Sequence, residues 1–136
     1  MSEIRFYHLT RQTLDEVLPV ILTRAFERGQ RAVVMARSAE RVEALAALLW
    51  EFDDHAFLPH GTKADGHAEW QPIWLTERDE NPNGAAALFL TDGAASAQIA
   101  AYSLVCELFD SGDEAAVAAA RAKWRDYLSA GYQLTY

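Results

Sequence analysis

The apolar run from Ala32 to Ala36 places the strongest constraint on how this chain can fold. Every residue of the run is apolar, and Arg31 and Arg37 flank it. A strand with one face in water alternates apolar and polar residues, whereas an uninterrupted apolar run is typical of a strand covered on both faces. Strands of that kind lie in the middle of parallel sheets that have helices on both sides. The run therefore predicts an α/β fold.

The patterns before and after this run predict a strand and two helices. Residues 4–9 form the strand, and Thr13-Leu-Asp-Glu16 is a capping-box pattern that opens the first helix. Pro19 lies beyond the first turn of that helix, so we expect it to bend the helix or to lower its stability. Ser38 is placed to cap the second helix, and the order strand, helix, strand, helix indicates a right-handed crossover unit. The predicted apolar positions are Val17, Val20, Ile21, Ala25 and Phe26 in the first helix, and Val42, Leu45, Leu48 and Leu49 in the second.

The second half of the chain adds further strands. Residues 86–91, which are apolar as far as Leu90, are predicted to form another buried strand, and they follow the turn-rich stretch Asp79–Gly84. Residues 103–109 fit either a strand or a helix. We predict a strand there, because the run ends in a turn signal and a clear helix follows it. Short strands are expected at 72–75 and, at the edge of the sheet, at 132–136.

Composition fits one globular domain over residues 1–136. The chain is 51% hydrophobic, enough for a sizeable core, and its longest apolar runs are too short to span a bilayer. No signal-peptide core follows Met1. The single cysteine, Cys106, excludes an internal disulfide and fits a reducing cytoplasm. A formal net charge of −8 at pH 7 argues against general nucleic-acid binding, which needs a basic surface.

Common catalytic motifs are missing from the sequence. The turn after the first strand, Thr10-Arg-Gln12, holds no glycine, so no dinucleotide-binding fingerprint opens the fold. No phosphate-binding loop of the GxxxxGK(S/T) type occurs anywhere. Ser103 and Cys106 lie outside any nucleophile elbow, and we interpret Cys106 as a small buried residue and His8 as a hydrogen-bonded histidine. We therefore expect no cofactor and no catalytic activity.

One loop carries enough histidines and carboxylates to be considered as a metal site. Imidazole and carboxylate ligands suit zinc or iron. Because the loop lacks the i, i+4 histidine pair of a helical zinc site, we interpret these side chains as ordinary loop residues and expect no metal. A small α/β metal-dependent enzyme that uses the loop from His55 to Glu69 is the alternative function. The candidate ligands are Asp53, Asp54, His55, His60, Asp65, His67 and Glu69.

The last part of the chain predicts a helix with an unusual charge. Acidic residues stand at its start, alanines fill its middle, and Gly131 can end it in a left-handed conformation. Although the chain is acidic overall, Arg121, Trp124 and Arg125 share one face of this helix, at i, i+3 and i+4. Two like charges four residues apart repel each other mildly, and a bound anion would reverse this effect. This face suits a ligand that is both acidic and aromatic, such as the end of a peptide.

A simpler interpretation of the same helix stays open at this point. Trp124 also belongs to an apolar stripe, and such a stripe usually packs on the core. In that case the arginines extend to solvent beside a half-buried Trp124. Spacing alone favours this packing interpretation. The stripe consists of Val117, Ala120, Trp124, Tyr127 and Leu128.

Stretches along essentially the whole chain match one known family in their order and spacing. They are Phe6-Tyr-His-Leu9, Leu45-Ala-Ala-Leu-Leu-Trp50, Phe57-Leu-Pro-His60, Asp79-Glu-Asn-Pro-Asn-Gly-Ala85, Ala120-Arg-Ala-Lys-Trp-Arg-Asp-Tyr127 and Ala130-Gly131. No one of these motifs is diagnostic by itself, but together their order and spacing are specific. In them the chain resembles the chi subunit family of bacterial DNA polymerase III.

The resemblance implies a Rossmann-like three-layer α/β domain, with a mostly parallel central sheet flanked by helices, that performs no nucleotide chemistry. Members of the family are non-catalytic parts of the clamp-loader complex, in the bacterial cytoplasm at the replisome on the nucleoid. They bind the psi subunit and the acidic C-terminal tail of single-stranded DNA-binding protein, and so link the polymerase holoenzyme to coated single-stranded DNA during replication. We therefore expect protein partners, and no direct binding of nucleic acid or membrane.

The resemblance also assigns a tail-binding site. The family's pocket takes an arginine, an aromatic residue and a second cation from the last helix, and these roles fall on Arg121, Trp124 and Arg125. The resemblance thus reverses the preference for the packing interpretation. Some members place a further cation where this chain has Val117, and we expect Lys123 to compensate from a neighbouring direction.

Two more aromatic residues are implied to bind partners. Trp50 and Phe57 match positions that the family uses at or near its partner surfaces. From the sequence pattern alone, both residues fit a role in the core equally well. The resemblance favours the surface role.

Overall fold

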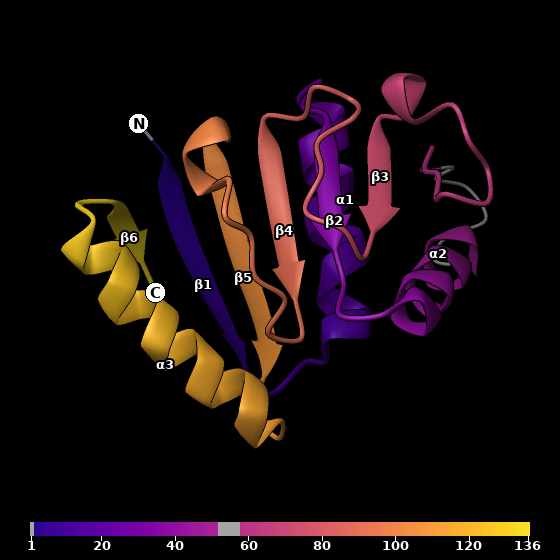
Figure 1. Cartoon of the computed structure of the whole chain (residues 1–136). Helices are drawn as coiled ribbons and strands as arrows, with labels where there is room; N and C mark the ends of the chain where they lie inside the picture. The colour runs from indigo at the N-terminus through magenta and orange to yellow at the C-terminus, as the bar shows by residue number, and fades with distance from the viewer. Residues whose placement is uncertain (1, 52–57) are drawn as a thin grey trace.

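The structure, a computed structural model, describes residues 2–51 and 58–136 of the chain (Figure 1). The strands are β1 (Glu3–Leu9), β2 (Ala32–Met35), β3 (Ile73–Thr76), β4 (Ala87–Thr91), β5 (Leu104–Asp110) and β6 (Gln133–Thr135). The helices are α1 (Leu14–Glu27), α2 (Ala39–Glu51) and α3 (Glu114–Ser129), and short 3-10 turns lie at η1 (Ala68–Trp70) and η2 (Ile99–Ala101). None of the helices in the described residues is long and apolar enough to cross a membrane.

The strands form a six-stranded sheet in the order β3-β2-β4-β5-β1-β6. Every strand pair in the described residues is parallel, which confirms the α/β, Rossmann-like prediction of a mostly parallel sheet. The predicted strand at 103–109 is confirmed as β5, in the middle of the sheet. The predicted C-terminal edge strand is confirmed as β6, which among the described residues pairs with β1 alone. The opposite edge is β3, where Gly61 adds a single bridge to Trp74.

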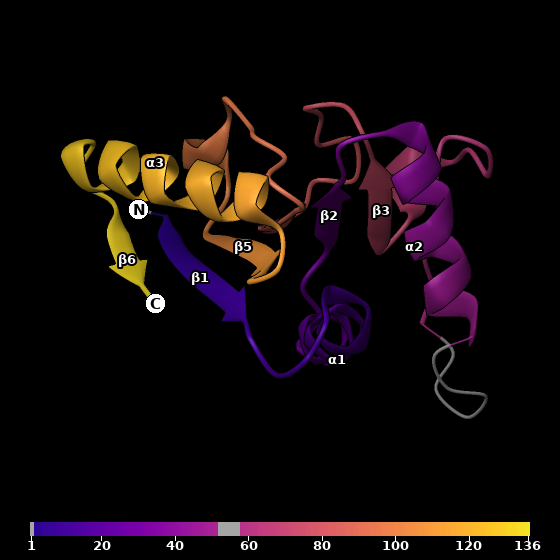
Figure 2. The same ribbon diagram turned by 90° about the horizontal axis from the view of Figure 1, so that it is seen from below.

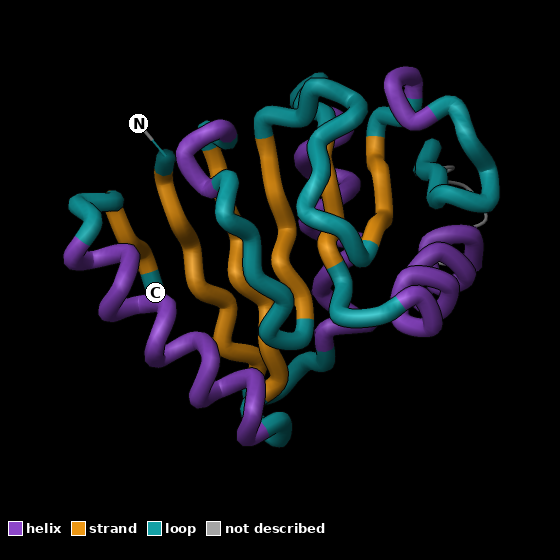
Figure 3. Tube along the Cα trace, viewed as in Figure 1, coloured by secondary structure: helices purple, strands orange, loops and turns teal. Residues whose placement is uncertain are grey.

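Helices and loops cover the sheet on both faces. One core cluster joins the sheet to α1 and α2, and a second joins it to α3. Figure 2 shows α1 and α3 on opposite sides of the strands, and Figure 3 shows that loops cover the part of the second face that α3 leaves open. Val34 belongs to the first cluster and Val33 to the second, and the whole of β2 is buried. The apolar run of β2 thus has the two covered faces that its composition predicts.

The buried face of α1 differs from the predicted one. Val20 and Phe26 were expected in the core, but both are exposed. The other three predicted residues, Val17, Ile21 and Ala25, do pack on the core. The prediction was wrong for Val20 and Phe26 because α1 carries apolar residues around most of its circumference, so spacing alone does not select the inner face. The buried side chains of α1 are Leu14, Leu18, Pro19, Leu22 and Ala25.

Pro19 lies within a continuous α1 and is buried against the core. Its carbonyl oxygen accepts a hydrogen bond of 2.7 Å from the hydroxyl of Thr23. The helix therefore runs through this residue, and its burial on the inner face accounts for the tolerance of a proline that provides no backbone N–H.

The helix starts predicted from the sequence are confirmed by their caps. The hydroxyl oxygen of Thr13 accepts the backbone N–H of Glu16 at 3.3 Å, and that of Ser38 accepts the N–H of Arg41 at 3.1 Å. The carboxylate of Asp113 accepts the N–H of Ala116 at 3.1 Å at the start of α3. These local hydrogen bonds fix where each helix begins, and thereby which side chains face the sheet.

Candidate functional site

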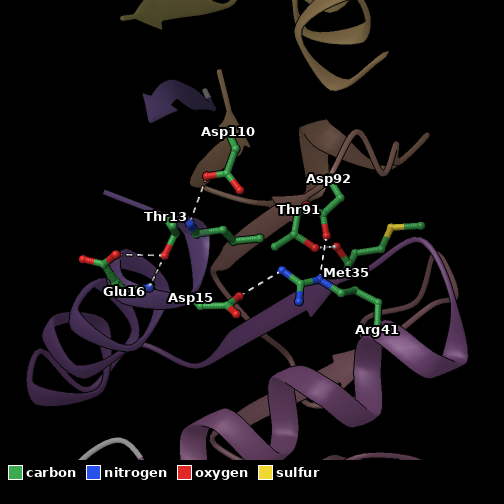
Figure 4. Close-up of polar contacts among 9 residues, drawn as sticks. Thr13, Asp15, Glu16, Met35, Arg41, Thr91, Asp92 and Asp110 are labelled. Atoms are coloured by element: carbon green, nitrogen blue, oxygen red, sulfur yellow. Dashed lines mark hydrogen bonds and ion pairs between the residues drawn. The ribbon is translucent and has the colours of Figure 1, made fainter. Parts of the chain in front are cut away.

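The carboxyl ends of the strands are where folds of this kind usually bind their ligands, and here that edge is filled by the chain's own side chains (Figure 4). The carboxylate of Asp110, at the end of β5, accepts the N–H of Leu14 at 3.0 Å. Together with Thr13, it engages N–H groups at the start of α1. In nucleotide-binding relatives of this fold, N–H groups at such a helix start bind phosphate. This anion site is therefore taken by an internal carboxylate.

Arg41 closes the same edge from α2. Its guanidinium forms ion pairs with Asp15 at 3.0 Å and with Asp92 at 2.8 Å (Figure 4). The hydroxyl of Thr91, just before Asp92, donates to the carbonyl oxygen of Met35 at 3.0 Å. Asp92 has a φ of 53°, a left-handed conformation that is uncommon for residues other than glycine. The strand ends are thus joined by a satisfied polar network.

Substitution of Asp110 tests this capping role. Asp110→Ala should lower the free energy of unfolding by about 0.5–2 kcal/mol, as loss of a helix cap does, because it removes the acceptor for the N–H of Leu14. Asp110→Asn keeps a side-chain oxygen and should retain most of that stability. Urea denaturation followed by circular dichroism gives both values. An alanine variant as stable as the unmodified protein would show that Asp110 does not cap α1.

A second candidate region lies on the face of the sheet that α3 covers, where this helix crosses β1 and β5. A hollow of about 120 Å³ opens there between the helix and the strand ends. Its size is on the order of a single aromatic ring, since an engineered cavity of about 150 Å³ binds benzene. The lining residues are Phe6, His8, Phe109, Val117, Ala120, Arg121, Trp124 and Tyr136.

Trp124 packs on the core and also lines the hollow. It is half-buried, and its ring packs edge-to-face on Phe6 with centroids 5.1 Å apart. The ring of Tyr136 also meets the indole edge-to-face, with centroids 6.3 Å apart. Leu128, which was predicted to pack in the same stripe, is 60% exposed, so that part of the prediction was wrong.

The two arginines of the predicted triad occupy different positions. Both side chains are exposed and, within the described residues, neither forms a hydrogen bond or an ion pair. Arg121 lines the hollow, whereas Arg125 lies one turn further along α3 and does not. Val117 occupies the position where some family members have a further cation, and here it forms an apolar wall of the hollow. An acidic group bound here would therefore meet Arg121 first.

Lys123 does not compensate for Val117, which corrects the expectation from the sequence. Its ammonium group turns inward, forms an ion pair with Glu107 at 3.0 Å and donates to the carbonyl oxygen of Ala94. The hydroxyl of Tyr127 donates to the other Glu107 oxygen at 2.8 Å. Burial raises the pKa of the Glu107 carboxyl, while the Lys123 charge and the Tyr127 hydrogen bond oppose that rise. This buried cluster fixes α3 on β5 and leaves Lys123 unable to reach the hollow.

His8 is only partly the satisfied histidine that the sequence suggested. Its Nδ1 lies 2.6 Å from the Tyr136 hydroxyl, and its ring stacks on Phe109 at 4.9 Å. Its Nε2, however, is buried without a hydrogen-bond partner in the described part of the chain. The sequence pattern predicted neither the pairing of His8 with Tyr136 nor the contacts of Glu107, because both join residues that are far apart in the chain.

Of the two aromatic residues assigned to partner surfaces, the structure describes only Trp50. Trp50 lies at the C-terminal end of α2, is 60% exposed and meets the ring of His60 edge-to-face at 4.9 Å. Trp50 is therefore on the surface rather than in the core. Phe57 lies outside the described residues.

The candidate metal loop is described only in part, because Asp53, Asp54 and His55 lie outside the described residues. The ring nitrogens of His60 lie 2.8 Å from the carbonyl oxygen of Leu58 and 3.1 Å from that of Ala46. Over residues 2–51 and 58–136, no three histidine, cysteine, aspartate or glutamate side chains are grouped to hold a metal ion.

Cys106 is buried in β5, and burial raises the pKa of its thiol to about 12, which confirms its interpretation as a small buried residue.

A larger hollow, of about 480 Å³, lies between the start of α2 and the end of β3 and was not predicted from the sequence. Side chains of both charge signs line it, among them Lys63 and Glu77.

Fold and surface together define a Rossmann-like α/β fold whose α3 borders an apolar hollow. The arginine at the edge of this hollow has no hydrogen bond or ion pair among the residues that the structure describes. The chain belongs to the DNA polymerase III chi subunit family (HolC), whose family model matches residues 1–135. It is similar to a probable DNA polymerase III subunit chi from Rickettsia prowazekii (strain Madrid E), with 27% identity over 105 residues. That match covers 75% of this chain and 64% of the relative, which is less than two thirds of the relative's length. Membership confirms the resemblance.

Proposed function

We propose that this chain is a non-catalytic adaptor of the bacterial replisome, working in the cytoplasm as part of the clamp-loader complex. It binds the psi subunit through one surface and the acidic C-terminal tail of single-stranded DNA-binding protein through another. It thereby links DNA polymerase III holoenzyme to coated single-stranded DNA. The occupied anion site at the start of α1 supports an adaptor role, because the helix start that would bind a nucleotide phosphate already holds Asp110.

The observation that carries the proposal is the hollow beside Arg121. In this family, the tail ends in acidic residues, a proline and a terminal phenylalanine. A guanidinium can bind the terminal carboxylate through two parallel hydrogen bonds. The phenyl ring matches the hollow in size, and Trp124 and Val117 provide apolar walls for it. Arg125 adds positive charge one turn away, toward the acidic residues that precede the ring.

The two proposed surfaces lie at opposite edges of the sheet. Trp50 is on α2, which packs beside the β3 edge, and Arg121 is on α3, which packs beside β6 at the other edge (Figure 1). Phe57 is proposed to belong to the Trp50 surface. Partners bound at these two places would not compete for the same residues. This arrangement supports simultaneous binding of psi and the tail.

The tail contact is small, so we expect a dissociation constant in the micromolar range rather than the nanomolar range. Many tails on one coated strand raise the effective concentration around the adaptor. A weak contact can then hold the polymerase near its template while still allowing exchange.

Affinity capture of the tagged chain from its native cells should recover clamp-loader subunits together with the single-stranded DNA-binding protein. Recovery of neither would contradict the proposal.

Replacement of Trp50 tests the psi surface. Trp50→Ala should weaken psi binding by about tenfold or more, because large aromatic residues tend to dominate interface energies. Trp70→Ala is the matched control, since Trp70 is 71% exposed, lies on η1 and has no proposed role. Calorimetry with purified psi gives both affinities, and melting temperatures should change little. Equal losses in the two variants would remove Trp50 from the psi surface.

A further inference from the structure

One buried polar atom beside α3 has no explanation within the fold. The Nε2 of His8 is shielded from solvent and lacks a hydrogen-bond partner in the described residues. Buried polar atoms in folded proteins are almost always paired, because an unpaired one loses its hydration without compensation. His8 lines the same hollow as Arg121, whose guanidinium is also unpaired within the described chain. Two residues that each carry a polar group without a partner in the described chain therefore line one small space.

The surroundings of His8 indicate which hydrogen-bonding role Nε2 plays. Its ring is fixed by stacking on Phe109 and by the Tyr136 hydroxyl, 2.6 Å from Nδ1. Either atom can donate in this contact. Where the Tyr136 hydroxyl donates, Nδ1 is the acceptor and the ring proton of a neutral imidazole lies on Nε2. Nε2 is then a donor that needs an acceptor. A carboxylate is such an acceptor, and Arg121 favours a negative charge in the same hollow.

We propose that His8 is a second recognition residue for the acidic end of the bound tail, donating its Nε2–H to the carboxylate that Arg121 also binds. This inference rests on the proposed function, because it concerns the same ligand. Tyr136 acts as a positioning residue that holds the imidazole in the donating form. The strand β1 and the helix α3 would each provide one donor to the hollow.

Such a pair of donors makes the site selective. A ligand without a carboxylate would leave both Arg121 and His8 unpaired in a confined space, and unpaired buried donors penalise binding strongly. A tail that ends in an amide keeps its shape and ring but loses the negative charge. The contribution of His8 should therefore depend on whether the peptide ends in a free acid or an amide.

The test is a double-mutant cycle between His8 and the end of the peptide. Two peptides with the tail sequence, one a free acid and one an amide, are titrated into the unmodified protein and into His8→Phe, which keeps an aromatic ring on Phe109. We expect His8→Phe to weaken free-acid binding by about tenfold and to leave amide binding nearly unchanged. Tyr136→Phe removes only the hydroxyl and should give a smaller loss of the same kind, since it no longer fixes the imidazole tautomer.

The outcomes separate this inference from the function on which it rests. If the unmodified protein binds the free acid but amidation weakens binding by the same factor in His8→Phe, His8 does not touch the carboxylate and the inference is wrong. Unfolding curves of both variants show whether they are folded, and Tyr136→Phe carries the test if His8→Phe is not. If the unmodified protein binds neither peptide, the proposed function itself fails, and the inference fails with it.

Discussion

Arg121→Ala is expected to weaken binding of the tail of single-stranded DNA-binding protein by about 10- to 150-fold. Loss of a hydrogen bond to a charged group typically costs about 1.5–3 kcal/mol, which corresponds to that range of affinities. The expectation rests on the position of Arg121 at the hollow and on its lack of a partner within the described residues. Fold stability should hardly change, because the side chain is exposed. Fluorescence anisotropy with a labelled tail peptide measures the effect.

Two comparisons sharpen this prediction. Arg125→Ala removes the same charge from the same helix but does not touch the hollow, so its effect should be smaller. Arg121→Lys keeps the charge and loses the planar fork, so it should restore only part of the affinity. Added salt should weaken the unmodified protein more than Arg121→Ala, since part of the attraction acts between surface charges. Equal affinities for all of these proteins would mean that Arg121 only extends into solvent.

Lys123→Met is expected to produce the largest loss of stability. Glu107 is only 3% exposed, and removal of Lys123 leaves its carboxylate buried with Tyr127 as its remaining side-chain partner. Breaking a buried pair by removing one member typically costs about 3–5 kcal/mol. Arg125→Met is the matched control, because Arg125 is an exposed cation on the same helix. Guanidinium denaturation at neutral pH should show a large loss for the first variant and almost none for the second.

The same variant has a predictable dependence on pH. Burial raises the pKa of the Glu107 carboxyl, and Lys123 opposes this rise, so the pKa should rise further in Lys123→Met. A carboxyl with a raised pKa in the folded state stabilises the fold below its unfolded pKa of about 4.3, and this contribution is lost as pH rises through the folded pKa. The deficit of Lys123→Met should therefore grow from acid to neutral pH. The double variant Lys123→Met/Glu107→Leu should recover most of the loss. A deficit that stays constant with pH would contradict this account.

The sequence predicted the fold well where the determining signals are local. The apolar run of β2, the caps at Thr13, Ser38 and Asp113, and the end of α3 near Gly131 each depend on neighbours within a few residues. Such signals survive in a single sequence because the contacts that satisfy them are close in the chain. Parallel pairing then followed from the alternation of strands and helices.

The site could be predicted only in part, because its decisive contacts join distant parts of the chain. Helical spacing placed Arg121 and Trp124 on one face, and the structure brings both to the hollow. Spacing could not show that Lys123 turns inward, since its partner Glu107 lies on β5. Nor could it pair His8 with Tyr136, at the two ends of the sequence. These contacts follow from the order of the strands in the sheet, which local patterns do not determine.

The central claim is that one chain holds psi and the tail at the same time. The most direct measurement is a calorimetric titration of the tail peptide into the chain alone and into the chain saturated with psi. We expect one peptide per chain, a dissociation constant in the micromolar range, and values that agree within about twofold in the two titrations. Loss of peptide binding in the presence of psi, or no binding to either sample, would contradict the adaptor account.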